Sequence, residues 1–137
     1  MPYSPRETVQ KTGFSLDTLR YYERIGLLDG IDRTAGGQRL FSDDDLAWLD
    51  VLRCLRDTGM PIARMRRYAE LARDGDDTFA ERAELLEEHD RDIERKIADL
   101  REEQARIKEK IGWYRRELTR REVTRREPAD AQAATPA

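Results

Sequence analysis

Residues able to contact nucleic acid gather near the start of the chain, in a run that contains Arg20, Tyr21 and Tyr22. An arginine can donate two hydrogen bonds to a base edge or a phosphate, and a tyrosine hydroxyl can reach the backbone. On the outer face of a helix, such side chains fit the major groove. The alternative for Arg20 is an exposed ion pair, because Asp17 and Glu23 each lie three residues away.

Two further residues could carry reactive chemistry, the single cysteine Cys54 and the single histidine His89. The charges of Arg53 and Arg56 favour a thiolate at Cys54, which would suit a sensor of electrophiles. A buried structural thiol is the alternative for Cys54, and a solvated side chain is the expectation for His89. One cysteine excludes an internal disulfide and a Cys-only metal site, and neither residue lies in a catalytic motif, so we expect no enzyme activity.

The elements that would position the first group of residues follow from capping signals. Ser4, Pro5 and Glu7 form a capping-box pattern for a first helix, and Gly13 ends it. Ser15 begins a second helix that runs to about residue 26. Its inward face is predicted to carry Leu16, Leu19, Tyr22 and Ile25. Two short helices joined by a tight turn are typical of a helix-turn-helix.

A glycine-containing segment, residues 29–41, predicts a hairpin between short strands, with Arg33 and Arg39 as its basic residues. Next to a helix-turn-helix, such a hairpin would be a wing that grips the neighbouring DNA backbone. Two more helices should follow, one from Ser42 to Gly59 with Val51 as a possible core residue, and one beginning at Pro61. The loop at residues 74–77 is the natural end of this head.

A long heptad pattern follows the head. From Ile93 to Leu118, apolar residues recur at alternating steps of four and three, interrupted only by Gln104, and Leu86 extends the pattern backwards. We call these residues the seam; they are Leu86, Ile93, Ile97, Leu100, Ile107, Ile111, Tyr114 and Leu118. One helix cannot bury such a stripe alone, so the seam predicts a homodimer.

Composition agrees with a small head and a long exposed helix, since 40% of the residues are charged and 38% are hydrophobic. The net charge of −3 is unusual for a protein that binds DNA. Residues 1–75 hold 12 basic and 12 acidic side chains, so any attraction to DNA must come from local placement of charge. No apolar run approaches the ~20 residues of a membrane span, and no signal sequence is evident, so a cytoplasmic protein is expected.

Residues 3–75 resemble the N-terminal DNA-binding domain of the MerR family of bacterial transcription regulators. The residues that carry the resemblance are Tyr3-Ser4-Pro5-Arg6-Glu7-Thr8-Val9, Gly13-Phe14-Ser15, Thr18-Leu19-Arg20-Tyr21-Tyr22-Glu23, Gly26-Leu27-Leu28, Arg33-Thr34, Gly37-Gln38-Arg39-Leu40-Phe41 and Asp45-Leu46. The resemblance implies a mainly α fold, with a winged helix-turn-helix head at 1–75 followed by a dimerising antiparallel coiled-coil helix at 76–122. The small, polar residues at the end of the chain predict a disordered tail at 123–137.

The resemblance also implies function. It predicts a homodimer on a pseudo-palindromic promoter site in double-stranded DNA, between the RNA polymerase recognition elements, with a spacer that the activated dimer bends and untwists. The DNA contacts implied are Ser15, Thr18, Arg20, Tyr21, Tyr22, Arg33, Arg39 and Arg56. At residue 38, glutamine replaces an aromatic residue that is common in the family.

The region around Cys54 is similar to the subgroup that responds to aldehydes and other electrophiles, in which one cysteine at this position is the suggested sensor. Metal-sensing members carry several cysteines near the long helix, and this chain does not, so we expect no metal or other cofactor. The rival hypothesis is a helical adaptor, in which the coiled coil recruits a protein and the head no longer binds DNA.

Overall fold

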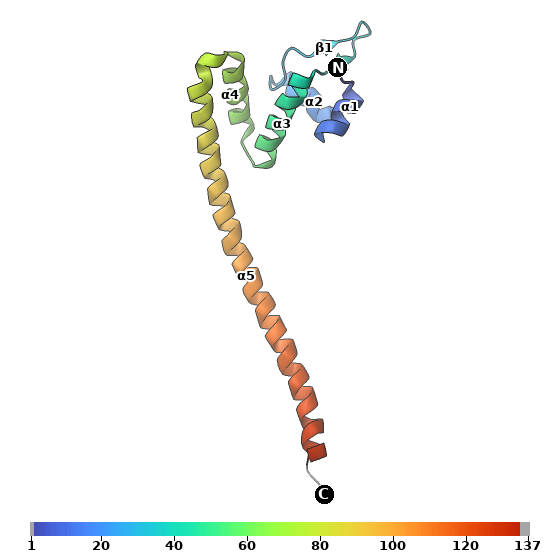
Figure 1. Cartoon of the computed structure of the whole chain (residues 1–137), viewed down its shortest axis with the longest axis vertical. Helices are drawn as coiled ribbons and strands as arrows, with labels where there is room; N and C mark the ends of the chain where they lie inside the picture. The colour runs from blue at the N-terminus through green and yellow to red at the C-terminus, as the bar shows by residue number, and fades with distance from the viewer. Residues whose placement is uncertain (1, 135–137) are drawn as a thin grey trace. The chain divides into compact units, whose positions relative to one another are not determined.

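The computed structural model describes residues 2–134, with side chains to Arg126, and the chain is mostly helical (Figure 1). It divides into two compact units, with the boundary after Arg91. The first unit contains the predicted head together with the start of the long helix. The predicted end of the head, at residue 75, lies within this first unit.

The two helices of the helix-turn-helix begin at the predicted caps. In α1 (Pro5–Thr12), the Ser4 hydroxyl accepts a hydrogen bond from the Glu7 amide, and the Glu7 carboxylate accepts one from the Ser4 amide, each at 3.1 Å. Gly13 ends α1 with a φ of 78°, a conformation that glycine adopts without strain. Ser15 caps α2 (Leu16–Arg24) through the Thr18 amide.

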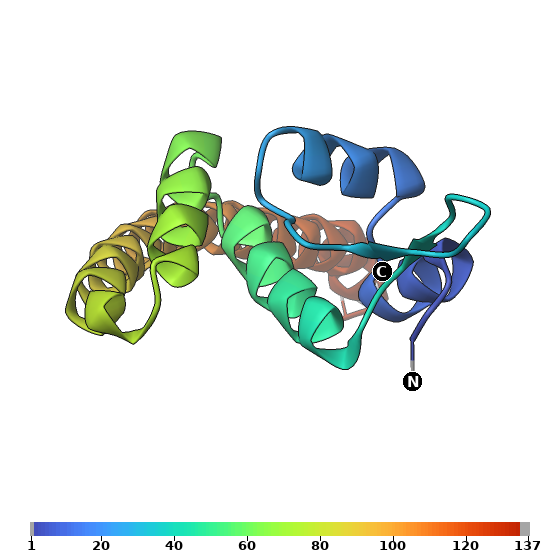
Figure 2. The same ribbon diagram turned by 90° about the horizontal axis from the view of Figure 1, so that it is seen from above.

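The predicted hairpin is present as β1 (Asp32–Arg33) and β2 (Arg39–Leu40), which pair antiparallel with Arg33 opposite Arg39. A pairing that the sequence did not predict extends the hairpin. Tyr3 and Phe41 form an isolated antiparallel bridge, with backbone N–H···O hydrogen bonds of 2.7 and 2.9 Å. The Tyr3 hydroxyl donates to Asp43, and that hydrogen bond raises the pKa of the phenol. In Figure 2 the hairpin reaches out on the side of the head away from α4.

The rest of the first unit consists of α3 (Asp43–Asp57), α4 (Ile62–Arg73), a short 3-10 turn (Asp76–Thr78) and the first turns of α5. Trp48 joins α3 to α4, since its ring stacks on Tyr68 and its indole N–H donates to the Leu27 carbonyl at 2.8 Å. The buried core includes Phe14, Leu19, Tyr22, Leu27, Phe41, Leu49, Leu52, Leu55, Met60 and Met65. The suggestion that Val51 joins this core is wrong, because its side chain is exposed.

The long helix α5 (Phe79–Ala134) carries the predicted seam. Most of the seam lies in the second unit, where Leu100 is 70% exposed and Ile107 is 61% exposed. α5 extends through Ala134, and residues 135–137 lie outside the described residues. Disorder of the tail from residue 123 stays a prediction. No helix within residues 2–134 is both long and apolar enough to cross a membrane.

Candidate nucleic-acid interface

The outward face of α2 carries Ser15, Arg20 and Tyr21, all exposed, with Thr18 half-buried beside them. The side chain of Arg20 approaches Asp17 at 3.8 Å, and both groups are largely open to solvent. Such a surface pair contributes little free energy, so it does not prevent Arg20 from reaching a ligand. The exposed ion pair and the DNA contact are therefore compatible with each other.

Tyr22 lies on the opposite face of α2, with its ring in the core. It is 3% exposed and makes an edge-to-face contact with Phe14, with centroids 5.4 Å apart. Burial raises the pKa of the Tyr22 phenol, and the nearby Arg56 guanidinium opposes part of that rise. The prediction that this ring belongs to the core is confirmed, and only its hydroxyl remains as a possible contact.

Arg56, near the end of α3, stands against the same cluster. Its guanidinium lies 4.6 Å from the centroid of the Phe14 ring and donates to Asp57 at 3.1 Å. A cation over an aromatic face is held in place by electrostatic attraction. The structure thus brings Arg56 and Tyr22, which are 34 positions apart in the sequence, into one neighbourhood.

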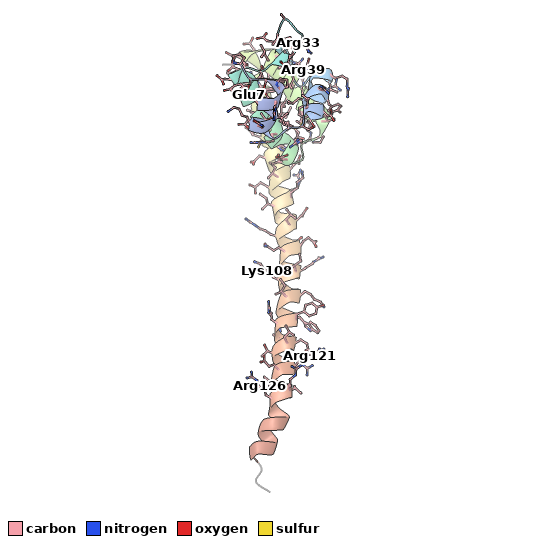
Figure 3. The ribbon with its side chains drawn as sticks, turned by 90° about the vertical axis from the view of Figure 1, so that its right-hand side faces the viewer. Glu7, Arg33, Arg39, Lys108, Arg121 and Arg126 are labelled. Carbon is pink, nitrogen blue, oxygen red and sulfur yellow. The ribbon has the colours of Figure 1, made fainter. Side chains whose placement is uncertain are left out.

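Arg33 and Arg39 come together on the hairpin, as their labels in Figure 3 show. Both contact Glu23 in the last turn of α2: Arg33 Nη2 lies 2.9 Å from Oε1, and Arg39 Nε lies 2.5 Å from Oε2. The sequence placed these arginines on a wing but did not predict Glu23 as their shared partner. No local pattern could have revealed the contact, because it joins α2 to two strands.

A shallow hollow of about 720 Å³ separates the helix-turn-helix from the hairpin. Arg20 and Arg39 line it together with Arg6, an exposed residue of the first turn of α1 that the sequence reasoning missed. The backbone of Gly36 and Gly37 forms its opposite wall. Three arginines on three different elements therefore border one concave surface.

The solvent exposure of Cys54 and of His89 differs from two of the sequence-based expectations. Cys54 is exposed on α3, so its interpretation as a buried structural thiol is wrong. His89 is 4% exposed, so the solvated side chain predicted for it is also wrong. Its Nε2 lies 2.7 Å from the Thr58 hydroxyl, which in turn donates to the carbonyl of Cys54 at 2.7 Å.

The second unit offers a different kind of surface. Trp113 and the seam residue Tyr114 are exposed, with their rings edge to face, and Lys110 lies within 5.4 Å of both ring centroids. Among the described residues, no group of three or more His, Cys, Asp or Glu side chains could hold a metal ion.

The class of protein follows from the head and the long helix: a winged helix-turn-helix protein whose long helix carries an exposed apolar stripe. Residues 3–71 match the family model described as the MerR helix-turn-helix family regulatory protein, and residues 46–110 match the model described as MerR, DNA binding. The chain therefore belongs to the MerR family.

Known proteins of the family are similar over most of the chain. An uncharacterised helix-turn-helix transcriptional regulator of Haemophilus influenzae is 37% identical over 116 residues, which cover 85% of this chain and 86% of that one. The crystal structure of HiNmlR, a MerR family regulator lacking the sensor domain and bound to promoter DNA, matches with a TM-score of 0.77 and 37% identity, over 85% of this chain and 92% of that chain. A putative MerR family regulator of Listeria monocytogenes matches with a TM-score of 0.85 and 33% identity, over 95% and 98%.

Proposed function

We propose that this protein is a transcription regulator that binds promoter DNA as a homodimer, with α2 in the major groove and the hairpin on the adjacent backbone. The observation that carries the proposal is the concave surface bordered by Arg6, Arg20 and Arg39. Guanidinium groups that border a concave surface around a helix-turn-helix fit phosphates and base edges. The promoter complex of HiNmlR, a relative with the same fold, supports this choice of ligand.

The proposed DNA-binding residues fall into groups according to the part of the DNA that each can contact. Arg20 and Tyr21 are exposed at the middle of α2 and are suited to bases or phosphates. Ser15 and Thr18 lie at the amino end of α2, where the helix dipole favours a phosphate. Arg33, Arg39 and Arg56 contact the backbone, and Tyr22 contributes its hydroxyl.

A second copy of the chain is the proposed partner of the seam. Ile97, Leu100, Ile107, Ile111 and Leu118 are all exposed within one helix, and such a stripe is stable in water only when another surface covers it. A two-fold dimer would then present two heads to a pseudo-palindromic site.

The charges along α5 favour an antiparallel pairing. Residues 81–94 carry seven acidic and two basic side chains, a balance of −5, whereas residues 113–126 carry six basic and two acidic, a balance of +4. An antiparallel arrangement places the acidic segment of one copy beside the basic segment of the other. A parallel arrangement would place like charges together, which is unfavourable at such short range.

The effector step is also a proposal. Cys54 is exposed and therefore open to electrophiles, and the carbonyl of Cys54 is joined to His89 on α5 through the Thr58 hydroxyl. Modification of Cys54 would change the position of α3 against α5 and so the angle between the two heads. On the promoter, that change would bend and untwist the spacer and present it to RNA polymerase.

An electrophoretic mobility shift with the DNA upstream of the chain's own gene tests the proposal. The wild-type protein should retain that fragment in the presence of excess random-sequence DNA, and Arg20→Ala should lose the preference. Arg101→Ala, on the exposed surface of α5, is the matched control and should behave as wild type. A wild-type protein that shows no preference for the fragment would favour the helical adaptor instead.

A further inference from the structure

Two arginines face each other across the hairpin. Arg33 and Arg39 are direct partners in the register of β1 and β2. Like charges directly opposite each other destabilise a strand pair. Each strand here has two residues and both residues of β1 are exposed, so the hairpin has little burial to offset that repulsion.

Glu23 provides the missing negative charge. One oxygen of its carboxylate contacts Arg33 at 2.9 Å and the other contacts Arg39 at 2.5 Å, so each oxygen holds one guanidinium. Arg33 also donates from Nη1 to the carbonyl of Gly37 at 3.0 Å, which ties the same network to the turn of the hairpin. These ion pairs therefore link the hairpin to the last turn of α2.

We propose that Glu23 is a positioning residue that occupies, in the free protein, the place of a DNA phosphate between Arg33 and Arg39. This inference rests on the proposed function. Glu23 holds the two arginines in the geometry that a backbone phosphate requires and then shares them with that phosphate. It also reduces the local charge of the hairpin network from +2 to +1, because it is the one carboxylate that contacts both arginines.

The charge difference has a measurable consequence. The salt dependence of DNA binding reflects the number of counterions released, about 0.9 per neutralised phosphate in duplex DNA. With Glu23 present, binding of Arg33 and Arg39 to DNA releases fewer counterions than binding of two arginines without a carboxylate partner would. Attraction to any duplex is therefore weaker, while the fixed hairpin geometry favours the correct site.

The test compares the wild-type protein with Glu23→Gln and with the control Glu70→Gln, which removes an exposed carboxylate from α4. Each protein is titrated over ~0.05–0.3 M salt with two duplexes, a random sequence and a sequence enriched from a random pool by the wild-type protein. Glu23→Gln should steepen the slope of log K against log salt by about one relative to Glu70→Gln. It should also bind the random duplex several-fold more tightly at low salt, and its preference for the enriched duplex should fall about tenfold.

Two further variants make the result decisive. Glu23→Gln combined with Arg33→Gln restores the local charge to +1, so its slope should return to that of the wild type. Glu23→Asp keeps the charge but is one methylene shorter; it should retain the wild-type slope while losing preference, and it serves if Glu23→Gln does not fold.

Equal weakening on both duplexes, with a slope in Glu23→Gln no steeper than in Glu70→Gln, would overturn the proposal and leave Glu23 a structural residue. A wild-type protein without preference for its enriched duplex would contradict the proposed function instead. Even then, the slopes on the random duplex decide whether Glu23 offsets the charge of the two arginines.

Discussion

The substitution Ile107→Asp should dissociate the proposed dimer. Ile107 is 61% exposed in the single chain and lies on the seam. Full burial of an isoleucine contributes ~1.5–3 kcal/mol, so covering the exposed part contributes about 1–2 kcal/mol in each copy. The two-fold symmetry doubles this to about 2–4 kcal/mol per dimer.

Aspartate also brings a carboxylate into an apolar contact in both copies, and an unpaired charge there costs several kcal/mol more. A loss of at least about 4 kcal/mol raises the dissociation constant of the dimer ~1000-fold. Sedimentation equilibrium over a range of protein concentrations measures that constant directly.

Arg106→Asp is the matched control, because the same new carboxylate then lies on the neighbouring exposed position, off the seam. The control should remain a dimer with at most a tenfold weaker constant. If Ile107→Asp dimerises as tightly as Arg106→Asp, the assignment of the seam as the dimer interface is refuted.

Three other changes probe the first unit. If Arg20 contacts a base, Arg20→Ala should cost ~1–3 kcal/mol of binding free energy and relax the sequence preference at one base position per half-site. If it contacts a phosphate, the loss of affinity should be the same on all sequences, with a shallower salt slope, and unchanged affinity would remove Arg20 from the interface. Cys54→Ser should keep DNA binding but abolish the transcriptional response to aldehyde or diamide in a promoter assay, and a full response would exclude Cys54 as the sensor. His89→Ala should lower the free energy of unfolding by about 2 kcal/mol in urea denaturation, because a buried side chain and its hydrogen bond with Thr58 are lost. Glu87→Ala, at an exposed position, should change the free energy of unfolding little, and equal values for the two variants would contradict the role of His89 in joining α5 to α3.

The sequence predicted the elements whose causes are local. Ser4, Ser15 and Ser42 cap their helices through residues three positions later, and those residues are visible in the sequence as printed. The exposed part of the seam, from Ile97 to Leu118, could be predicted as well, because heptad spacing defines one face of a helix; Leu86 instead packs against the core of the first unit.

The contacts that the sequence did not predict all join distant residues. Glu23 meets Arg39, Tyr3 pairs with Phe41, and His89 reaches Thr58 from another helix. Burial of His89 depends on how the start of α5 packs against α3, and the spacing of apolar residues in the sequence does not predict that packing. Exposure of Cys54 has the same origin, since only the assembled head decides which side of α3 is covered.

Local pairing supports α5 near residue 117. Glu117 accepts hydrogen bonds from both Arg120 and Arg121, one turn further along the helix. The hydrogen bond from Arg120, followed by that from Arg121, lowers the pKa of the Glu117 carboxyl to about 2. Such pairs favour a helix without any tertiary contact.

Hydroxyl-radical footprinting of the wild-type protein on the DNA upstream of its gene tests the central claim most directly. A homodimer that places two α2 helices and two hairpins on DNA predicts two protected half-sites related by a dyad, separated by one helical turn of ~10–10.5 base pairs or a multiple of it. A single asymmetric patch, or no protection at protein concentrations that saturate the mobility shift, would contradict the account.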